Sequence, residues 1–405
     1  MRLIRYNVIY ALLVMGCVWS PAEDISSTTS LVEANNKFAF DIYQVLKKEE
    51  GNIFFSPFSI ATALTMTLTG ARGNTELEMQ KVLHLTEIVK KKENISQKYK
   101  LLCDYINSFQ QKEGILLSVA NSLWLQKEFD VEQSFQQILR NMYASEIFLV
   151  DFQRETENAR LTINKWVEQK TQDKIKDLLS PGSINPLVRL ILVNAIYFKG
   201  KWYSEFDKNL TKEDDFFLPD GEKVKVNMMT KKETCKYAEN DELQVLELEY
   251  KTSNISMVLF LPRQRNGLSM LESKLNMETM QSLLNSMRMK EIKVFLPRFT
   301  FTSQFSLSSV LKTIGMQDAF DPMKADFTGI SKSDKLFIFD VLHKAFVEVN
   351  EEGTEAAAAT GVIVGLTCVP AEPVVFRADH PFLFAIRERT AGSILFIGRV
   401  YNPAR

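Results

Sequence analysis

The chain has 405 residues, with 49 Lys and Arg against 50 Asp and Glu and a formal net charge of −1. Apolar residues make up 45% of the chain and charged residues 24%, which is typical of a folded globular protein and excludes collagen-like, coiled-coil and disordered chains. Because the charges balance, no basic excess is present to gather phosphates, and we expect no nucleic-acid partner.

Residues 1–22 predict a secretory signal. Arg2 and Arg5 precede an apolar run over residues 8–19, and small residues flank a cleavage point after residue 22. A bacterial lipoprotein signal at Cys17 is the alternative, although the preceding residues fit it loosely. The run is too short to span a bilayer and no later run is long enough, so we expect a secreted, extracellular protein without a membrane segment.

Helical spacing of apolar residues dominates the first third of the mature chain, and strand-like apolar runs become more frequent after it. The predicted helices cover residues 31–46, 59–68, 99–109 and 159–170. The predicted strands cover residues 116–125, 188–198, 245–248, 255–261, 292–299, 337–350 and 393–401. This order, without an internal repeat, indicates an α+β fold with large antiparallel or mixed sheets.

The mature chain, residues 23–405, contains no Gly, Ser or Pro-rich linker and is predicted to be a single domain. Its three cysteines, Cys103, Cys235 and Cys368, permit at most one disulfide and have no spacing typical of zinc sites. Stability is therefore expected to come from a large apolar core.

Three sequence triplets can accept N-linked glycans. They begin at Asn94, Asn209 and Asn254, and each has Ser or Thr two positions later. Asn94 follows a run of three lysines and a glutamate, so it is expected to be the most exposed of the three.

No enzyme motif is present. The chain has no G-x-S-x-G, H-E-x-x-H or Walker sequence, and its three histidines are His84, His343 and His380. His343 lies in a strand-like run, where a hydrogen-bonded core histidine is the expected role. His380 is expected in a turn that leads into an apolar strand. We therefore expect no enzyme, and no metal or cofactor.

The segment EEGTEAAAATGVIVGLTC, residues 351–368, is the most informative part of the chain. Four consecutive alanines favour a helix locally. At a period of two, however, small and then branched apolar residues fall on one face, which indicates a strand that can be buried in a sheet. The alternative is a surface loop rich in Ala and Gly.

Four separate sequence blocks, in order, resemble the serpin superfamily. They are NIFFSPFSI at residues 52–60, LVNAIYFKGKW at 192–202, FRADHPFLF at 376–384 and SILFIGRV at 393–400. The signal and the loop length are similar to those of a neuroserpin-like or pancpin-like member.

This resemblance implies three β-sheets, about nine helices and an exposed reactive-centre loop over about residues 351–376. It also implies the mechanism, in which a serine protease cleaves the loop, stays covalently attached, and is trapped when the loop inserts into the main sheet. The implied partner is that protease, and the inhibitor is expected to be a monomer.

The resemblance also assigns roles to individual residues. Ser56, Ser59, Asn194 and His343 match a polar cluster that controls opening of the main sheet, and ordinary satisfaction of core polar groups is the alternative. Trp202 matches a tryptophan at the top of that sheet, where the loop begins to insert. The lysine run at residues 90–92 is a candidate site for a sulfated polysaccharide, although such runs are usually solvated.

In this resemblance residues 351–360 form the hinge of the reactive-centre loop, and their side chains distinguish between two functions. Inhibitory relatives keep small or uncharged residues on its inward face, whereas non-inhibitory serpins, which act as carriers, chaperones or storage proteins, commonly lose them. This chain keeps the inhibitory pattern at Glu351, Gly353, Thr354, Ala356, Ala358 and Thr360.

The family's spacing from the hinge glycine places the scissile bond between Thr367 and Cys368. The bonds Leu366–Thr367 and Cys368–Val369 remain alternatives. No Lys or Arg occurs between residues 353 and 376, and a trypsin-like pocket needs such a cation for its buried aspartate. An elastase-like target is therefore expected first and a chymotrypsin-like target second.

Overall fold

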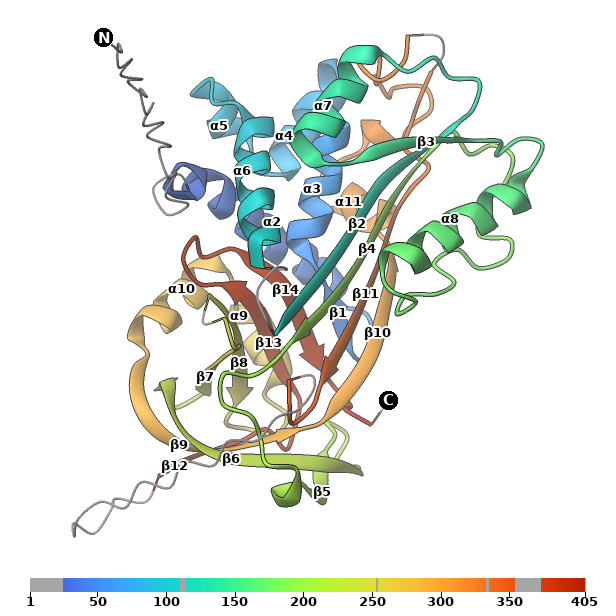
Figure 1. Cartoon of the computed structure of the whole chain (residues 1–405). Helices are drawn as coiled ribbons and strands as arrows, with labels where there is room; N and C mark the ends of the chain where they lie inside the picture. Colours follow the sequence, from blue (N-terminus) through green and yellow to red (C-terminus); the bar gives the residue numbers. More distant parts are fainter. Residues whose placement is uncertain (1–24, 110–113, 253, 333–334, 354–372, 405) are drawn as a thin grey trace, which may run out of the picture.

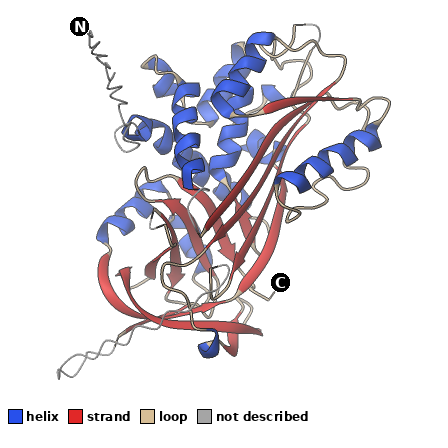
Figure 2. Ribbon diagram, in the orientation of Figure 1, coloured by secondary structure: helices blue, strands red, loops and turns tan. Residues whose placement is uncertain are grey.

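The computed structural model describes residues 25–109, 114–252, 254–332, 335–353 and 373–404. Most of the helices gather at the upper end of the view, and β-sheet extends from among them to the lower end (Figures 1 and 2). The helices over residues 268–274 and 277–286 lie lower, beside the β-structure. The predicted signal and the central part of the reactive-centre loop, residues 354–372, lie outside the described residues.

Ten α-helices form within the described residues. Helix α3 begins where the Ser56 side chain accepts a hydrogen bond from the Ser59 amide and Pro57 occupies the first helical position. Every residue of α3 is buried. The helices are α2 (Thr29–Leu46), α3 (Pro57–Leu68), α4 (Gly73–Val82), α5 (Thr86–Lys90), α6 (Ile95–Ser108), α7 (Gln133–Tyr143), α8 (Thr156–Lys170), α9 (Leu268–Lys274), α10 (Met277–Ser286) and α11 (Ser308–Thr313). The four predicted helices are thus confirmed, with small differences at their ends.

A five-stranded sheet has the strand order β10, β11, β4, β2, β3. Its strands are β2 (Ile115–Gln126), β3 (Glu146–Val150), β4 (Leu190–Gly200), β10 (Phe299–Ser306) and β11 (Asp340–Val349). The central neighbours β4 and β11 are parallel, while β4 is antiparallel to β2 and β11 to β10. Helix α3 packs on one face of this sheet, against β2 and β4, and α8 contacts β2.

A nine-stranded sheet forms the rest of the β-structure, in the order β1, β14, β13, β8, β7, β6, β9, β12, with β5 paired to β6. Its strands are β1 (Ile53–Phe55), β5 (Lys212–Phe217), β6 (Lys223–Glu239), β7 (Leu243–Glu249), β8 (Ile255–Pro262), β9 (Arg288–Pro297), β12 (Val374–Arg377), β13 (Phe382–Glu388) and β14 (Ile394–Val400). The long strand β6 joins two arms of this sheet, because it pairs with β5 and β9 over most of its length and with β7 at its end. The arm that contains β5 and β9 crosses the bottom of the view (Figure 1). Counting the arms separately gives the three sheets that the resemblance implies, and the α+β class is confirmed.

One predicted strand is wrong as a single element. Residues 292–299 belong to two strands, because β9 ends at Pro297 and β10 begins at Phe299 in the other sheet. Proline has no amide proton to donate, and the next amide, that of Arg298, donates to the Asn227 carbonyl oxygen at 2.8 Å. The chain therefore passes from one sheet to the other at this point.

Two of the cysteines, Cys103 and Cys235, lie within the described residues. Cys103 and Cys235 are both free thiols, and burial raises the pKa of each to about 12. Neither thiol is therefore suited to be a nucleophile. Cys368 lies outside the described residues.

Candidate functional site

A row of polar side chains crosses the five-stranded sheet at one level. His343 on β11 is the register partner of Asn194 on β4, and Asn194 is in turn the register partner of Asn121 on β2. His343 and Asn194 are fully buried, and Asn121 is half-buried. Because all three lie at the same level on adjacent strands, their side chains can bond directly across the sheet.

The start of α3 completes this polar row. The Asn194 amide nitrogen donates to the Ser59 hydroxyl and to Asn121 Oδ1, and the Ser59 hydroxyl donates to Asn121 Oδ1 at 3.1 Å. The Ser56 amide donates to His343 Nε2 at 3.1 Å. One helix end thus ties together three strands, and we call Ser56, Ser59, Asn121, Asn194 and His343 the polar row.

The hydrogen bonds fix the protonation of His343. Nε2 accepts from the Ser56 amide, so the proton is on Nδ1, which donates to Asn194 Oδ1. Burial lowers the pKa of His343 to about 3, because the charged imidazolium would lose its hydration. The ring is therefore a neutral structural link between two strands, and the expectation of a hydrogen-bonded core histidine is confirmed.

The seam between β4 and β11 is open at one end. Their pairing runs from Ile191 and Asp340 to Tyr197 and Phe346, although both strands continue beyond that point. Beyond the last pair, the indole nitrogen of Trp202 donates to the Asn350 carbonyl oxygen at 3.0 Å. A side-chain contact thus replaces the backbone ladder where the chain leaves β11.

Residues 350–353 form a turn that is fastened over this open end, and we call this turn the hinge anchor. The Trp202 amide donates to the Glu352 carbonyl oxygen at 3.2 Å, and the Phe206 amide donates to the Glu351 carbonyl oxygen at 2.8 Å. Lys208 forms an ion pair with Glu352. The anchor therefore bonds to the segment that directly follows β4.

The Glu351 carboxylate is buried beneath the hinge anchor, with 1% of its surface exposed. Arg298 donates through one nitrogen to both carboxylate oxygens at 2.5 and 2.6 Å, and the Thr211 hydroxyl donates at 2.7 Å. Burial would raise the pKa of Glu351, but the hydrogen bonds from Thr211 and Arg298 outweigh it and the pKa lies below its usual value. Glu351 is therefore held as a charged, satisfied carboxylate.

Gly353 closes the hinge anchor in a conformation that suits glycine. Its φ is +74°, and a Cβ at this position would lie 2.2 Å from the Gly200 carbonyl oxygen and 2.4 Å from the Trp202 amide nitrogen. Both are backbone atoms that cannot rotate away. Any other residue must therefore lift the anchor from β4.

An aromatic and cationic layer lies next to the hinge anchor. Trp202 stacks on Tyr250 with centroids 4.6 Å apart, and the Lys231 ammonium lies 4.6 Å from the centroid of Phe206. Lys231 forms an ion pair with Glu233, yet its burial is the larger effect and lowers its pKa. Trp202 is thus held by packing on one side and by its hydrogen bond to Asn350 on the other.

The predicted site residues fall into two groups in the structure. Ser56, Ser59, Asn194 and His343 come together in the polar row, whereas Trp202 lies with Glu351 and Gly353 at the hinge anchor. The remaining hinge residues, Thr354, Ala356, Ala358 and Thr360, and the residues of the candidate bonds, Leu366, Thr367, Cys368 and Val369, lie outside the described residues.

Sequence reasoning missed three members of these groups. Asn121 is in the polar row, and Arg298 and Thr211 bind Glu351. Arg298 is 53 positions from Glu351 in the chain and Thr211 is 140 positions away. The one available signal for Arg298 was its place directly after the proline that ends a strand.

The three glycan acceptor asparagines differ in exposure. Asn94 and Asn209 are exposed, whereas Asn254 is half-buried. Asn94 caps α6 through Oδ1, which accepts from the Gln97 amide at 3.0 Å, so the cap does not use the amide nitrogen that carries a glycan. Asn94 is therefore a more accessible acceptor than Asn254.

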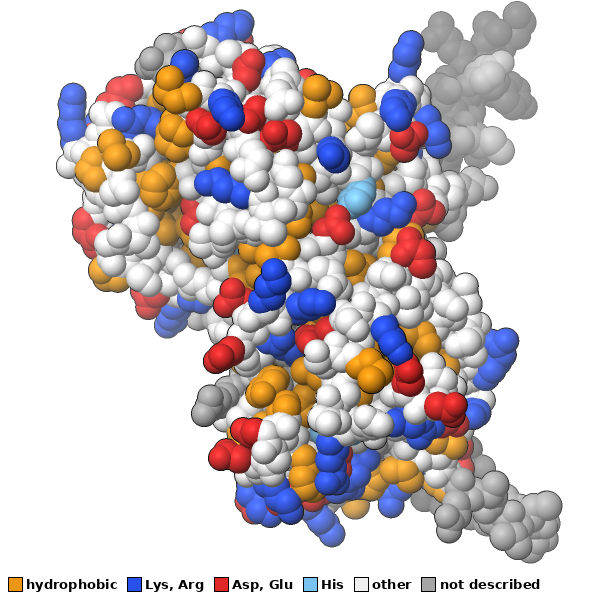
Figure 3. Space-filling view, turned by 180° about the vertical axis from the view of Figure 1, so that it is seen from behind, with side chains coloured by type: hydrophobic (Ala, Val, Ile, Leu, Met, Phe, Trp, Pro, Cys, Tyr) orange, Lys and Arg blue, Asp and Glu red, His pale blue; other side chains and the backbone are white. Residues whose placement is uncertain are grey.

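The lysine run at residues 90–92 is exposed, but its first member is paired. Lys90 forms an ion pair with Glu87 at 2.7 Å. Seen from behind, basic and acidic side chains are interspersed over most of the molecular face (Figure 3). The polysaccharide site stays a prediction.

The described part of the chain shows neither a membrane-spanning helix nor a metal-binding cluster. No helix there is long and apolar enough to cross a membrane. In the same residues, no group of three or more His, Cys, Asp or Glu side chains is arranged to hold a metal ion.

Comparisons with known proteins agree with this architecture. The model of a family described as Serpin (serine protease inhibitor) matches residues 33–403. The chain is 41% identical to Serpin B8 of Homo sapiens over 379 residues, 92% of this chain and 99% of that protein. It is 39% identical to the leukocyte elastase inhibitor of Homo sapiens over 384 residues, again 92% and 99%. A crystal structure of uncleaved ovalbumin superposes with a TM-score of 0.83 at 30% identity, covering 92% of this chain and all of that one. The chain therefore belongs to the serpin family of serine protease inhibitors.

Proposed function

We propose that this serpin is a secreted suicide substrate that inhibits an elastase-like or chymotrypsin-like serine protease. The observation that carries the proposal is the geometry of the β4–β11 seam. These strands are parallel neighbours, and the chain leaves β11 at the open end of the seam they form. A segment that turns back from this end and enters the seam would run antiparallel to both strands.

Such insertion would be favourable. It replaces one parallel ladder of seven residue pairs with two antiparallel ladders, one on each side of the new strand. The inserted residues also bury apolar surface, at about 25 cal/mol per Å². Small side chains at positions 356–360 would enter with little steric resistance.

The uncleaved state would persist because two groups hold the seam closed. The polar row links β4 to β11 through His343 and Asn194, and the hinge anchor fastens the end of β11 to the segment after β4. Insertion has to break the polar row and the hinge anchor before the new strand can form. These contacts therefore raise a kinetic barrier to insertion. Cleavage would remove the tether that keeps the loop outside.

The covalent step follows ordinary acyl transfer. The protease serine oxygen attacks the carbonyl carbon of the residue before the scissile bond, the carbon–nitrogen bond breaks, and the proton passes to the leaving amine. The loop then carries the protease as an ester. Insertion before water attacks this ester would move the protease away from the hinge anchor and trap the complex.

The loop sequence supports the target class. It contains no Lys or Arg between Gly353 and Phe376, so a trypsin-like pocket would be left with an unpaired aspartate. The relative named leukocyte elastase inhibitor, 39% identical, is consistent with an elastase-like target. Cleavage between Thr367 and Cys368 is proposed, with the two neighbouring bonds as alternatives.

Secretion is proposed from the sequence of residues 1–22. The first described element begins at Ser26, so removal of the signal would leave every described helix and strand intact. Expression in a secreting eukaryotic cell should give a mature amino terminus at residue 23 and a mass decrease after glycosidase treatment. A retained residue 1 would contradict the proposal.

The inhibitory mechanism is tested by incubating the protein with elastase, chymotrypsin and trypsin. We expect a complex with elastase that survives SDS and boiling, and mass spectrometry of the released peptide should identify the cleaved bond. Thr354→Arg places a charge on the inward face of the hinge and should convert the inhibitor into a substrate that is cut at the same bond. Glu355→Arg changes a charge on the opposite face and serves as the matched control.

Each outcome of this experiment has a distinct meaning. Cleavage without a stable complex in the unmodified protein favours a non-inhibitory carrier, chaperone or storage role. Rapid inhibition of trypsin but not of elastase contradicts the target class. An undiminished complex with the Thr354→Arg variant contradicts the proposed inward face.

A further inference from the structure

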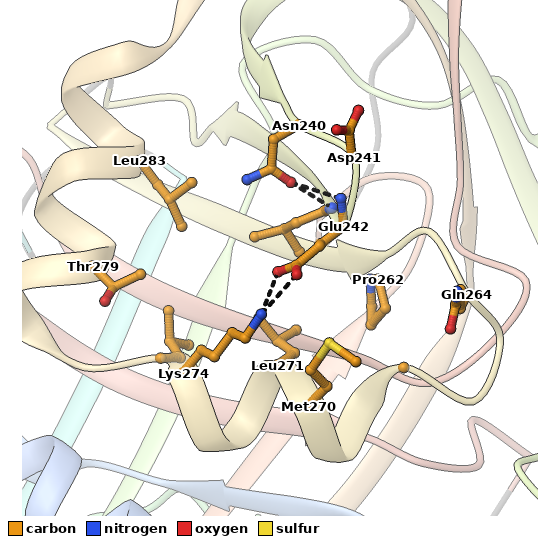
Figure 4. A pocket seen from close by; sticks show the side chains of 13 residues that line it. Asn240, Asp241, Glu242, Pro262, Gln264, Met270, Leu271, Lys274, Thr279 and Leu283 are labelled. Atoms are coloured by element: carbon orange, nitrogen blue, oxygen red, sulfur yellow. Dashed lines mark hydrogen bonds and ion pairs between the residues drawn. The ribbon is translucent and has the colours of Figure 1, made fainter.

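A cavity of about 210 Å³ lies away from the hinge anchor and the polar row, between the turn that joins β6 to β7, the end of β8, and helices α9 and α10 (Figure 4). None of its lining residues belongs to either group described above. The lining residues are Asn240, Asp241, Glu242, Leu243, Pro262, Gln264, Gly267, Met270, Leu271, Lys274, Leu275, Thr279 and Leu283. We call this cavity the α9–α10 pocket.

The floor of the α9–α10 pocket is apolar. Leu243, Leu271 and Leu275 are buried. Leu243 is the first residue of β7, Leu271 belongs to α9, and Leu275 directly follows α9. Leu283 of α10 reaches in from the other side, and Met270, 49% exposed, lies at the mouth (Figure 4). Protein interiors leave few voids of this size, and a flexible thioether at the mouth can adapt to a ligand.

The volume limits what the pocket can hold. Sites for drug-sized ligands usually measure about 300–1,000 Å³. At about 210 Å³ the α9–α10 pocket accommodates one ring-sized group and not an extended molecule.

Three charged side chains lie at the rim of the pocket, Asp241, Glu242 and Lys274, and the Asp241 carboxylate points away from the cavity (Figure 4). Lys274 of α9 donates to both carboxylate oxygens of Glu242 at 2.7 Å, so one ion pair joins the turn to the helix across the mouth (Figure 4). A charged ligand would have to compete with this bidentate pair or lie beside a like charge. An uncharged ligand leaves the pair intact.

One hydrogen-bond donor at the rim is oriented by the fold. Asn240 Oδ1 accepts from the amides of Glu242 and Leu243 at 2.9 and 2.8 Å, which fixes the plane of the side-chain amide. Its nitrogen is then on the side of Leu283 (Figure 4). It can donate to an acceptor that sits above the apolar floor.

We propose that the α9–α10 pocket binds a small uncharged molecule with one ring-sized apolar body and one hydrogen-bond acceptor, such as an aromatic ketone. The apolar body lies on Leu271, Leu275 and Leu283, and the acceptor receives a hydrogen bond from the side-chain nitrogen of Asn240. This site is separate from the inhibitory mechanism and does not depend on it.

Four probes of nearly equal size test the proposal. The full-length protein, with its leucine methyl groups isotope-labelled, is titrated with acetophenone, ethylbenzene, benzoate and benzylamine and followed by NMR. Acetophenone should shift the pocket methyl resonances at low millimolar concentration. It should bind roughly tenfold more tightly than ethylbenzene, which lacks the acceptor, and than either charged probe.

Two variants locate the site. Leu283→Trp places an indole in the cavity and should abolish acetophenone binding, while Leu161→Trp, at an exposed position of α8, should not. Asn240→Asp keeps the oxygen that orders the turn and removes the donor, so the preference for acetophenone over ethylbenzene should disappear.

Three results would overturn the proposal. The first is the absence of methyl shifts at 10 mM acetophenone, a concentration on the order of the weakest affinity expected for a ligand of this size. The second is binding of benzoate or benzylamine that is as tight as the binding of acetophenone. The third is undiminished binding of acetophenone to the Leu283→Trp variant. Retained preference for acetophenone in Asn240→Asp would remove Asn240 from the site and with it the proposed acceptor.

Discussion

Replacing Gly353 by alanine tests the hinge anchor most directly. The added Cβ would lie 2.2 Å from the Gly200 carbonyl oxygen, 2.4 Å from the Trp202 amide nitrogen and 2.6 Å from the Lys201 Cα. All three atoms belong to the backbone, so no side chain can rotate to relieve the overlap. We expect the anchor to lift from the end of β4.

The free-energy cost of the substitution combines backbone strain at residue 353 with the hydrogen bonds that the anchor loses. A non-glycine residue at φ +74° costs about 1–2 kcal/mol by itself. Lifting the anchor also breaks three neutral hydrogen bonds, two from Trp202 and one from Phe206, each contributing about 1 kcal/mol. The alanine variant should therefore destabilise the anchored state by about 4–5 kcal/mol, which corresponds to a factor of at least 10² in the population of the open form.

Hydrogen exchange of the Trp202 and Phe206 amides measures this effect. Both should lose at least about 10²-fold protection in Gly353→Ala, following the free-energy estimate. Gly182→Ala is the matched control, because Gly182 has a φ of +78° and its Cβ would have no atom within 4 Å. If the two variants lose the same protection at these amides, or if Gly353→Ala loses none, the steric argument is wrong.

Three further predictions concern the same structure. Arg298→Ala should lower the free energy of unfolding by about 2 kcal/mol, because Glu351 loses charged hydrogen bonds, and Arg298→Lys should retain part of this stability. Chemical denaturation measures the difference. Equal stability of the two variants and the unmodified protein would contradict the role of the Arg298–Glu351 pair. For His343, the pKa is about 3 when folded and about 6.5 when unfolded. The unfolded chain therefore binds one more proton between these values, so stability should fall as the pH drops from 6.5 towards 3, by about 5 kcal/mol in all. His343→Gln should remove about 1.4 kcal/mol per pH unit of that slope in denaturation curves between pH 6.5 and 4, and unchanged slopes would refute the neutral link. Cleavage of the loop near Leu366 should raise the melting temperature, since the freed strand can complete the sheet, and equal melting temperatures before and after nicking would count against insertion.

Periodicity predicted those elements whose apolar pattern is strong. The helix over residues 59–68 and the strand over residues 188–198 were found because nearly every position is buried. The 17-residue strand β6 was missed, because it is rich in lysine and its exposed positions interrupt the apolar pattern. The local pattern of apolar residues also could not show that the chain passes from one sheet to the other after Pro297.

The candidate site was predictable where sequence blocks carried it and not elsewhere. Ser56, Ser59 and Asn194 lie inside two blocks that resemble the family, and the structure brings them together with His343. Arg298 has no such signal, because its importance comes from a buried carboxylate that is distant in the chain. Partners of this kind depend on the register and crossing of strands, which sequence periodicity does not specify.

The unpaired end of the β4–β11 seam has a mechanical consequence. Two strands that are paired to both ends resist separation with all their residue pairs together. Strands with an unpaired end can separate from that end, one residue pair after another. The last residue pair before the unpaired end is Tyr197 with Phe346. Counted from this pair, Asn194 with His343 is the fourth. Once the hinge anchor has lifted, separation from this end breaks three residue pairs before it reaches Asn194 and His343, so the outer part of the seam can open and reclose while the inner part stays paired.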